Sequence, residues 1–216
     1  IMISASHNPY HDNGVKFFTS DGQKFSDELE SKIETLLAKN QTVESGALGR
    51  ARRHTRAADD YVDYCLEQVG ADLDLKDFTI VLDCAHGAAY KVGPKLLNKL
   101  GAEVVLTGAL PNGKNINDEC GSVHPQHISE LVKKHNADLG IALDGDADRV
   151  VLADAHGNVV DGDGILYVLT VYRQANDWLM EGVVGTVMTN FGLEMACREF
   201  GIDFERSNVG DRYVLE

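Results

Sequence analysis

The chain has 216 residues, of which 44% are hydrophobic and 25% charged, values that are ordinary for a soluble globular protein with one large domain or two smaller ones. Its formal net charge of −14 argues against nucleic acid or an anionic membrane surface as a partner, because both attract Lys and Arg rather than carboxylates. No apolar run approaches the roughly 20 residues that span a bilayer.

The first third of the chain predicts short strands and helices joined by long polar segments. Ser26 is the expected N-cap of a helix, because acidic residues follow it and apolar residues at helical spacing share one face. The polar stretch from Ser4 to Gly14 is read as a loop. The other expected segments are, in chain order, strands over 1–3 and 15–18, a connection over 39–57 and a helix over 59–69.

From residue 72 onward, strands alternate with helices. The expected strands are 78–82, 103–106, 139–143, 150–153, 183–187 and 202–205. The expected helices are one that stops at Gly101, one over 127–135, one through Val171 and one over 190–200. This alternation predicts an α/β protein, with consecutive α/β units and mixed, largely parallel sheets.

The cysteines are widely separated and form no Cys-x-x-Cys pair, which argues against a zinc site or a redox motif. They are Cys65, Cys84, Cys120 and Cys197. We expect reduced thiols and a cytoplasmic location. The chain begins inside a short apolar run at Ile1 and stops equally abruptly at Glu216, so we expect both ends to be cuts through a longer protein.

Three aspartates at alternate positions follow the expected strand 139–143: Asp144, Asp146 and Asp148. If the extended conformation continues, alternate side chains face one side and the carboxylates converge. Their repulsion then requires a cation among them, and oxygen ligands beside a phosphate favour Mg²⁺. The cluster also follows the carboxyl end of a buried strand, where open α/β sheets bind ligands. The pattern therefore predicts a metal site.

Other readings of this segment remain open. A solvated acidic turn is one, although a turn needs only one or two Asp residues. An EF-hand loop does not fit, because Arg149 stands at its sixth position and Ala155 at its twelfth. Arg149 could contact phosphate through two hydrogen bonds or form a salt bridge back to the cluster.

The segment Ser4-Ala5-Ser6-His7-Asn8-Pro9 concentrates side chains suited to nucleophilic or acid–base chemistry. By itself it equally suits a structural turn, since Ser and Asn-Pro are common turn formers. A further stretch, Asp83 to Gly87, joins a strand to a helix, where an anion can bind, although such turns are more often structural.

Taken together, these segments resemble the α-D-phosphohexomutase superfamily, over essentially the whole chain. The resemblance rests on Ser-Ala-Ser-His-Asn-Pro at 4–9, Asp-Asn-Gly-Val-Lys at 12–16 and Asp-Gly-Asp-Ala-Asp-Arg at 144–149. Residues 111–117, Cys120-Gly121-Ser122, His124-Pro125 and 208–214 resemble the bacterial phosphoglucosamine mutases within it.

The resemblance implies interconversion of glucosamine 6-phosphate and glucosamine 1-phosphate, on the route to UDP-N-acetylglucosamine. Ser6 would carry a phosphoryl group and pass it to the sugar, giving a bisphosphate that returns its other phosphate to Ser6. One Mg²⁺ would be held by the three aspartates and a phosphoserine oxygen. Lys16 would be the general acid or base, unless it is an exposed strand lysine. His7 would support the loop, and Arg149 and Arg212 would contact phosphate.

The resemblance also divides the chain. Residues 1–57 would be the C-terminal part of domain 1, 58–162 domain 2, and 163–216 the N-terminal part of domain 3. Domain 4, which grips the non-reacting phosphate in this family, would be absent, so we expect these residues alone not to turn over sugar phosphate. The expected partner is a phosphorylated hexosamine, and a homodimer is compatible with this assignment.

Alternative functions remain. A haloacid-dehalogenase-type phosphatase also places Asp-x-Asp after a strand, but it uses the first Asp as nucleophile and usually continues with Thr. A third Asp and an Arg follow in this chain. Another phosphohexomutase, acting on glucose or mannose phosphates, and a non-catalytic module that binds a cation or a sugar phosphate are further candidates. Phosphate on Ser6 rather than on Asp144 would distinguish the mutase from the phosphatase.

Overall fold

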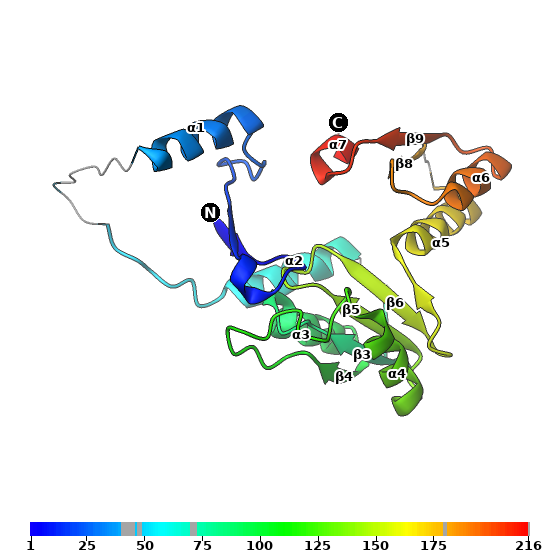
Figure 1. Ribbon diagram of the computed structural model, residues 1–216. Helices are drawn as coiled ribbons and strands as arrows, with labels where there is room; N and C mark the ends of the chain where they lie inside the picture. The colour runs from blue at the N-terminus through cyan, green and yellow to red at the C-terminus, as the bar shows by residue number, and fades with distance from the viewer. Residues whose placement is uncertain (40–45, 47–48, 70–72, 179–180, 216) are drawn as a thin grey trace.

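The computed structural model describes residues 1–39, 46, 49–69, 73–178 and 181–215 (Figure 1). A five-stranded mixed sheet of order β4-β3-β5-β6-β7 lies at its centre. Its strands are β3 (Thr79–Asp83), β4 (Glu103–Thr107), β5 (Leu139–Leu143), β6 (Val150–Asp154) and β7 (Val159–Val160). β3 pairs in parallel with β4 and β5, whereas β5-β6 and β6-β7 are antiparallel.

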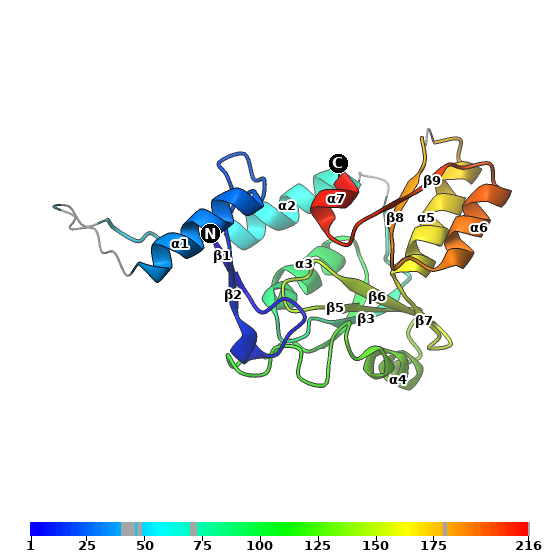
Figure 2. The ribbon, with the colours of Figure 1, turned by 45° about the horizontal axis from the view of Figure 1, so that its top comes forward.

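Helices cover both faces of the central sheet, α3 (Val92–Lys99) on one and α4 (Pro125–His135) on the other (Figure 2). Successive residues of β3 therefore enter different cores. Val81 packs with residues of α4, and Leu82 packs on the α3 side near Val92. This double burial explains why β3 is a continuous apolar run rather than an alternating one.

An N-terminal arm extends from this layer. It contains β1 (Met2–Ser4), η1 (Tyr10–Asp12), β2 (Gly14–Lys16) and α1 (Asp27–Ala38), and β1 pairs antiparallel with β2. Ser26 caps α1, since its hydroxyl accepts from the Leu29 amide at 3.4 Å. The next helix, α2 (Ala57–Val69), packs on α3, and Asp63 pairs with Lys99 at 2.7 Å.

A C-terminal arm follows the central sheet. It contains α5 (Gly162–Ala175), β8 (Val183–Thr186), α6 (Phe191–Glu199), β9 (Phe204–Ser207) and α7 (Asp211–Leu215). β8 and β9 are parallel, and Val183 packs with Leu193 and Cys197 in a separate small core. In both ribbon views α7 lies at the end of the C-terminal arm, on the side that faces the N-terminal arm (Figures 1 and 2). None of the described helices has the length and apolar character needed to cross a membrane.

The predicted α/β architecture with mixed sheets is confirmed, while several boundaries are wrong. The strand expected at 202–205 is Phe204–Ser207, because Ile202 still closes the end of α6 by donating to the Cys197 carbonyl at 2.9 Å. The strand expected at 15–18 is Gly14–Lys16, and the expected loop before it contains η1. Strand β7 and helix α7 were not predicted. Residues 40–45 and 47–48 of the connection expected over 39–57 lie outside the described residues.

Replacing Gly140 by Ala tests how tightly β5 packs on α4. A Cβ there would lie 2.6 Å from Val132 Cγ2 and 2.7 Å from Ile128 Cγ1, so we expect a loss of about 1–3 kcal/mol in the free energy of unfolding, measured by urea denaturation. Gly162→Ala is the matched control, since nothing lies within 4 Å of its Cβ position. Equal stability of the two variants would contradict the close packing.

Candidate functional site

The three aspartates converge through a turn rather than through an extended strand. β5 ends at Leu143, after which the Ala147 amide donates to the Asp144 carbonyl at 3.1 Å and Ala147 has a φ of 62°. The predicted cause of the convergence, continued extension, is therefore wrong. The convergence itself is present, because one carboxylate oxygen from each of Asp144, Asp146 and Asp148 lies within 4.8 Å of the others.

Two carboxylate oxygens of this cluster are buried without a hydrogen-bond partner: Asp144 Oδ2 and Asp146 Oδ1. The other oxygen of Asp144 accepts from the Arg149 amide at 3.2 Å. Burial raises the pKa of Asp144, and the charges of Asp148 and Asp146 act in the same direction. An unpaired buried carboxylate is costly unless a cation approaches it, so the oxygen-only set fits a hard metal ion. The three aspartates could hold such a metal.

Lys16 supplies one positive charge to the cluster. Its ammonium lies 2.8 Å from Asp146 Oδ2 and 3.7 Å from Asp148 Oδ2. The hydrogen bond to Asp146 raises the pKa of Lys16 despite the opposing effect of burial. For Asp146, burial disfavours the charged form, but hydrogen bonds from Lys16 and Ser4 outweigh it and lower the pKa. Lys16 is therefore a charged partner of the site and not merely an exposed strand lysine.

The serine loop docks directly on the aspartate turn. Ser4 Oγ donates to Asp146 Oδ2 at 2.6 Å and accepts from the Ser6 amide at 2.8 Å. The Ser6 carbonyl accepts from the Gly145 amide at 3.1 Å. Residues about 140 positions apart in the sequence are thus in contact. The Lys16 side chain and the Ser6 backbone both reach the aspartate turn.

His7 and the two arginines occupy different positions relative to this cluster. His7 Nδ1 lies 3.3 Å from Ser6 Oγ, which fits a supporting role in the loop. Arg149 is largely exposed, and its Nε lies 4.0 Å from Asp148 Oδ1, at the limit of an ion pair. Arg212 Nη1 is 3.2 Å from Asp27 Oδ1, a contact outside the aspartate cluster.

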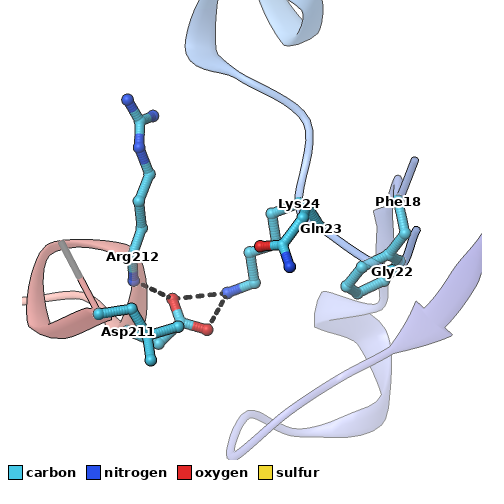
Figure 3. Close-up of a pocket in the computed structure, with 7 residues that line it drawn as sticks. Phe18, Gly22, Gln23, Lys24, Asp211 and Arg212 are labelled. Carbon is cyan, nitrogen blue, oxygen red and sulfur yellow. Dashed lines mark hydrogen bonds and ion pairs between the residues drawn. The ribbon is translucent and has the colours of Figure 1, made fainter. Parts of the chain in front are cut away.

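Arg212 nevertheless shares a groove with Lys16. A cavity of about 290 Å³ between the N-terminal arm and α7 is lined by Lys16, Lys24 and Arg212, among others. An adjoining cavity of about 440 Å³ again contains Lys24 and Arg212 (Figure 3). Within it Lys24 reaches Asp211 at 2.6 Å, while the Arg212 side chain points away from that pair. The 290 Å³ groove is therefore lined by three basic side chains and by three acidic ones, Asp27, Glu30 and Asp211. Lys24 and Arg212 are paired with two of these carboxylates.

Asn117 and Asp83 help to build the site, although no sequence pattern predicted a specific role for either residue. Asn117 Nδ2 donates to the Ser6 carbonyl at 2.8 Å and to the Asn8 carbonyl at 2.9 Å. Asp83, fully buried at the end of β3, accepts from the Ala85 amide at 2.9 Å and from the Gly121 amide at 2.8 Å. The sequence feature that could have revealed Asp83 is an acidic residue directly after an apolar run typical of a strand. Its satisfied carboxylate favours the structural reading of the 83–87 turn.

The thiols take no part in this chemistry. Burial raises the pKa of both Cys84 and Cys120 to about 12, so neither forms a thiolate near neutral pH. All four cysteines are free in the structure.

Sequence comparison assigns the chain to a family. Sequence models of the phosphoglucomutase/phosphomannomutase family match in order: α/β/α domain I over residues 1–44, domain II over 59–157 and domain III over 161–216. The chain belongs to this family. The aspartate turn falls within the domain II match, and the serine loop within the domain I match.

Relatives within the family are about half identical to this chain over the region that they have in common. It is 51% identical to the phosphoglucosamine mutase of Burkholderia pseudomallei and 52% identical to that of Aromatoleum aromaticum, in each case over 100% of the chain and 48% of the relative. The chain thus spans about half the length of these relatives.

Solved structures show the same fold. A phosphoglucomutase/phosphomannomutase family protein of Burkholderia thailandensis superposes with a TM-score of 0.76 and 24% identity, over 98% of this chain and 45% of that one. The open form of the phosphoglucomutase pp63/parafusin of Paramecium superposes with a TM-score of 0.67 and 20% identity, over 96% of this chain and 44% of that one. At these identities the likeness concerns the fold alone.

Replacing Lys16 by Met tests whether its ammonium competes with a divalent cation. Without this charge the carboxylates lose their internal counter-ion, so we expect Mg²⁺ or Mn²⁺ to bind about fivefold more tightly, as for an ion pair worth about 1 kcal/mol. Isothermal titration measures the affinity, and Lys24→Met is the control because Lys24 pairs with Asp211 instead. Unchanged or weaker metal binding in the Lys16 variant alone would contradict the competition.

Replacing Asp144 by Asn tests the cost of its buried charge. Without metal, we expect the variant to unfold at a higher temperature than the unsubstituted protein, by about 2–4 °C for each kcal/mol gained in the free energy of unfolding. Mg²⁺ should no longer raise the unfolding temperature of the variant. The folded-state pKa of Asp144 is raised, so the unsubstituted protein loses stability as pH rises through that pKa. The gain should therefore shrink at acid pH. A scan in which the variant unfolds earlier at neutral pH would argue against this account.

Proposed function

We propose that this chain forms part of a phosphoglucosamine mutase, which interconverts glucosamine 6-phosphate and glucosamine 1-phosphate through a phosphoserine at Ser6. The observation that carries the proposal is the docking of the serine loop on an aspartate turn that retains two unpaired buried oxygens. A serine beside a prospective metal site has what phosphoryl transfer requires, namely a carrier oxygen and charge neutralisation.

The cation of the proposed site is one Mg²⁺, held by Asp144, Asp146, Asp148 and an oxygen of phosphorylated Ser6. It would offset the negative charge of the phosphoryl group and favour its transfer. Oxygen ligands beside a phosphate support this choice over zinc, which takes nitrogen and sulfur ligands in its structural sites.

The reaction places demands on the residues around Ser6. A sugar hydroxyl attacks the phosphorus, so that its O–P bond forms as the bond between Ser6 Oγ and phosphorus breaks. The hydroxyl proton leaves to a base, and Ser6 Oγ regains a proton. Lys16 is proposed as the general acid or base of this step, because its ammonium lies beside Asp146 at the site. The hydrogen bond to Asp146 raises the pKa of Lys16, so the ammonium must loosen from this carboxylate to give up its proton. The reverse transfer from the other phosphate of the bisphosphate restores phospho-Ser6.

Arg149 and Arg212 are proposed to bind phosphate, and His7 to orient the serine loop. Arg149 is exposed beside the turn, and Arg212 faces the groove that contains Lys16. The identity of about half with named phosphoglucosamine mutases supports glucosamine over glucose or mannose as the sugar. A cytoplasmic location and a homodimer complete the proposal.

The phosphatase alternative fits this geometry less well. It requires Asp144 to act as a nucleophile, yet this side chain is fully buried and one of its oxygens accepts from the Arg149 amide. Ser6 is the better phosphate carrier.

The substitution Ser6→Ala in the intact protein tests the proposal. We expect mutase activity on glucosamine 6-phosphate to fall to the background of the assay, because the phosphoryl carrier is lost, while metal still binds the aspartates. Mass spectrometry of the unsubstituted protein should place phosphate on Ser6. Phosphate found on Asp144 instead, or full turnover by the Ala variant, would sink the proposal, and faster turnover of glucose or mannose phosphate would overturn the choice of sugar.

A further inference from the structure

Asn117 joins the central domain to the serine loop through its side chain. Its Nδ2 donates to the carbonyls of Ser6 and Asn8, at 2.8 and 2.9 Å. An amide nitrogen has two hydrogens, so both are used and the side chain cannot turn over without losing both bonds. The residue is only 6% exposed, which limits replacement of these bonds by water.

The backbone of Asn117 is itself held firmly. Its amide donates to the Ala85 carbonyl at 2.9 Å, and the Ala85 amide donates to the buried carboxylate of Asp83. Its φ of 57° lies in the left-handed region, which Asn adopts more readily than most residues with a side chain. A chain of hydrogen bonds therefore runs from the end of β3 through Asn117 to the Ser6 carbonyl.

Ser6 needs such support because its own backbone is unusual. Its φ is 51°, a conformation that is uncommon for Ser and persists only when the surroundings determine it. Its amide is fixed by Ser4 Oγ, and its carbonyl by the Gly145 amide and Asn117 Nδ2. With the peptides on both sides fixed, the direction of the Cα–Cβ bond is fixed as well.

We propose that Asn117 is a positioning residue for phosphoryl transfer, which aims Ser6 at the aspartate turn by holding the carbonyls of Ser6 and Asn8. The inference rests on the proposed function of Ser6. Asn117 is assigned no contact with the reacting atoms, so its loss should lower kcat and leave the KM for the sugar phosphate unchanged.

Two variants of the intact protein distinguish the hydrogen bonds that Asn117 donates from the packing of its side chain. Asn117→Asp keeps the size of the side chain but sets carboxylate oxygens against two carbonyls, whereas Asn117→Ala removes the group. If donation positions Ser6, kcat falls about 10- to 100-fold in the Ala variant and at least as far in the Asp variant, with KM within about twofold. If only packing matters, the Asp variant keeps the activity of the unsubstituted protein and the inference is overturned.

Two further readouts keep the test independent of overall folding. Hydrogen exchange at the amides of residues 6–8 should accelerate in both variants. The unfolding midpoint and the Mg²⁺ affinity of the Ala variant should stay near those of the unsubstituted protein. If the Ala variant has a lower unfolding midpoint as well as a lower kcat, the loss of activity reflects a loss of stability, and the positioning role is overturned. Absence of phosphate on Ser6 in the unsubstituted protein is a failure of the proposed function, whereas normal cycling in both variants is a failure of this inference alone.

Discussion

Repulsion among three carboxylates on one short turn is the constraint to which the surrounding structure responds. One oxygen from each of Asp144, Asp146 and Asp148 lies within 4.8 Å of the others, and such a group is stable only if positive charge and hydrogen-bond donors surround it. Lys16 and Ser4 both direct a donor at the same oxygen of Asp146, and the Arg149 amide serves one oxygen of Asp144. The oxygens left over define where a cation would sit.

The site needs close backbone approach as well as charge. A Cβ on Gly145 would lie 2.5 Å from the Ser6 carbonyl and 2.6 Å from Ile116 Cδ1, so only glycine lets the two loops meet at this point. Beneath them, the Ala88 amide donates to the Gly145 carbonyl at 2.8 Å, which ties the turn after β3 to the turn after β5. Two parallel strands thus present their carboxyl ends as a shared platform for a loop from the N-terminal arm.

Local sequence patterns were sufficient for the parts of the site that lie on one segment. The apolar run of β5 followed by alternating aspartates located the aspartate turn, and the cap at Ser26 located α1. Patterns of this kind do not report contacts between distant segments. The left-handed Ala147 that folds the turn, and the reach of Asn117 to the serine loop, depend on tertiary packing and were therefore beyond sequence periodicity.

The two arms meet through ion pairs on the molecular surface. Lys24 pairs with Asp211, and Arg212 with Asp27, and each of these side chains is at least 45% exposed. Exposed pairs are worth about 0–1 kcal/mol and are screened within about 10 Å at 0.1 M salt. Contacts this weak can dissociate and reform readily. The ion pairs across the groove are thus sensitive to ionic strength, so the opening of the groove should respond to the salt content of the surrounding solution.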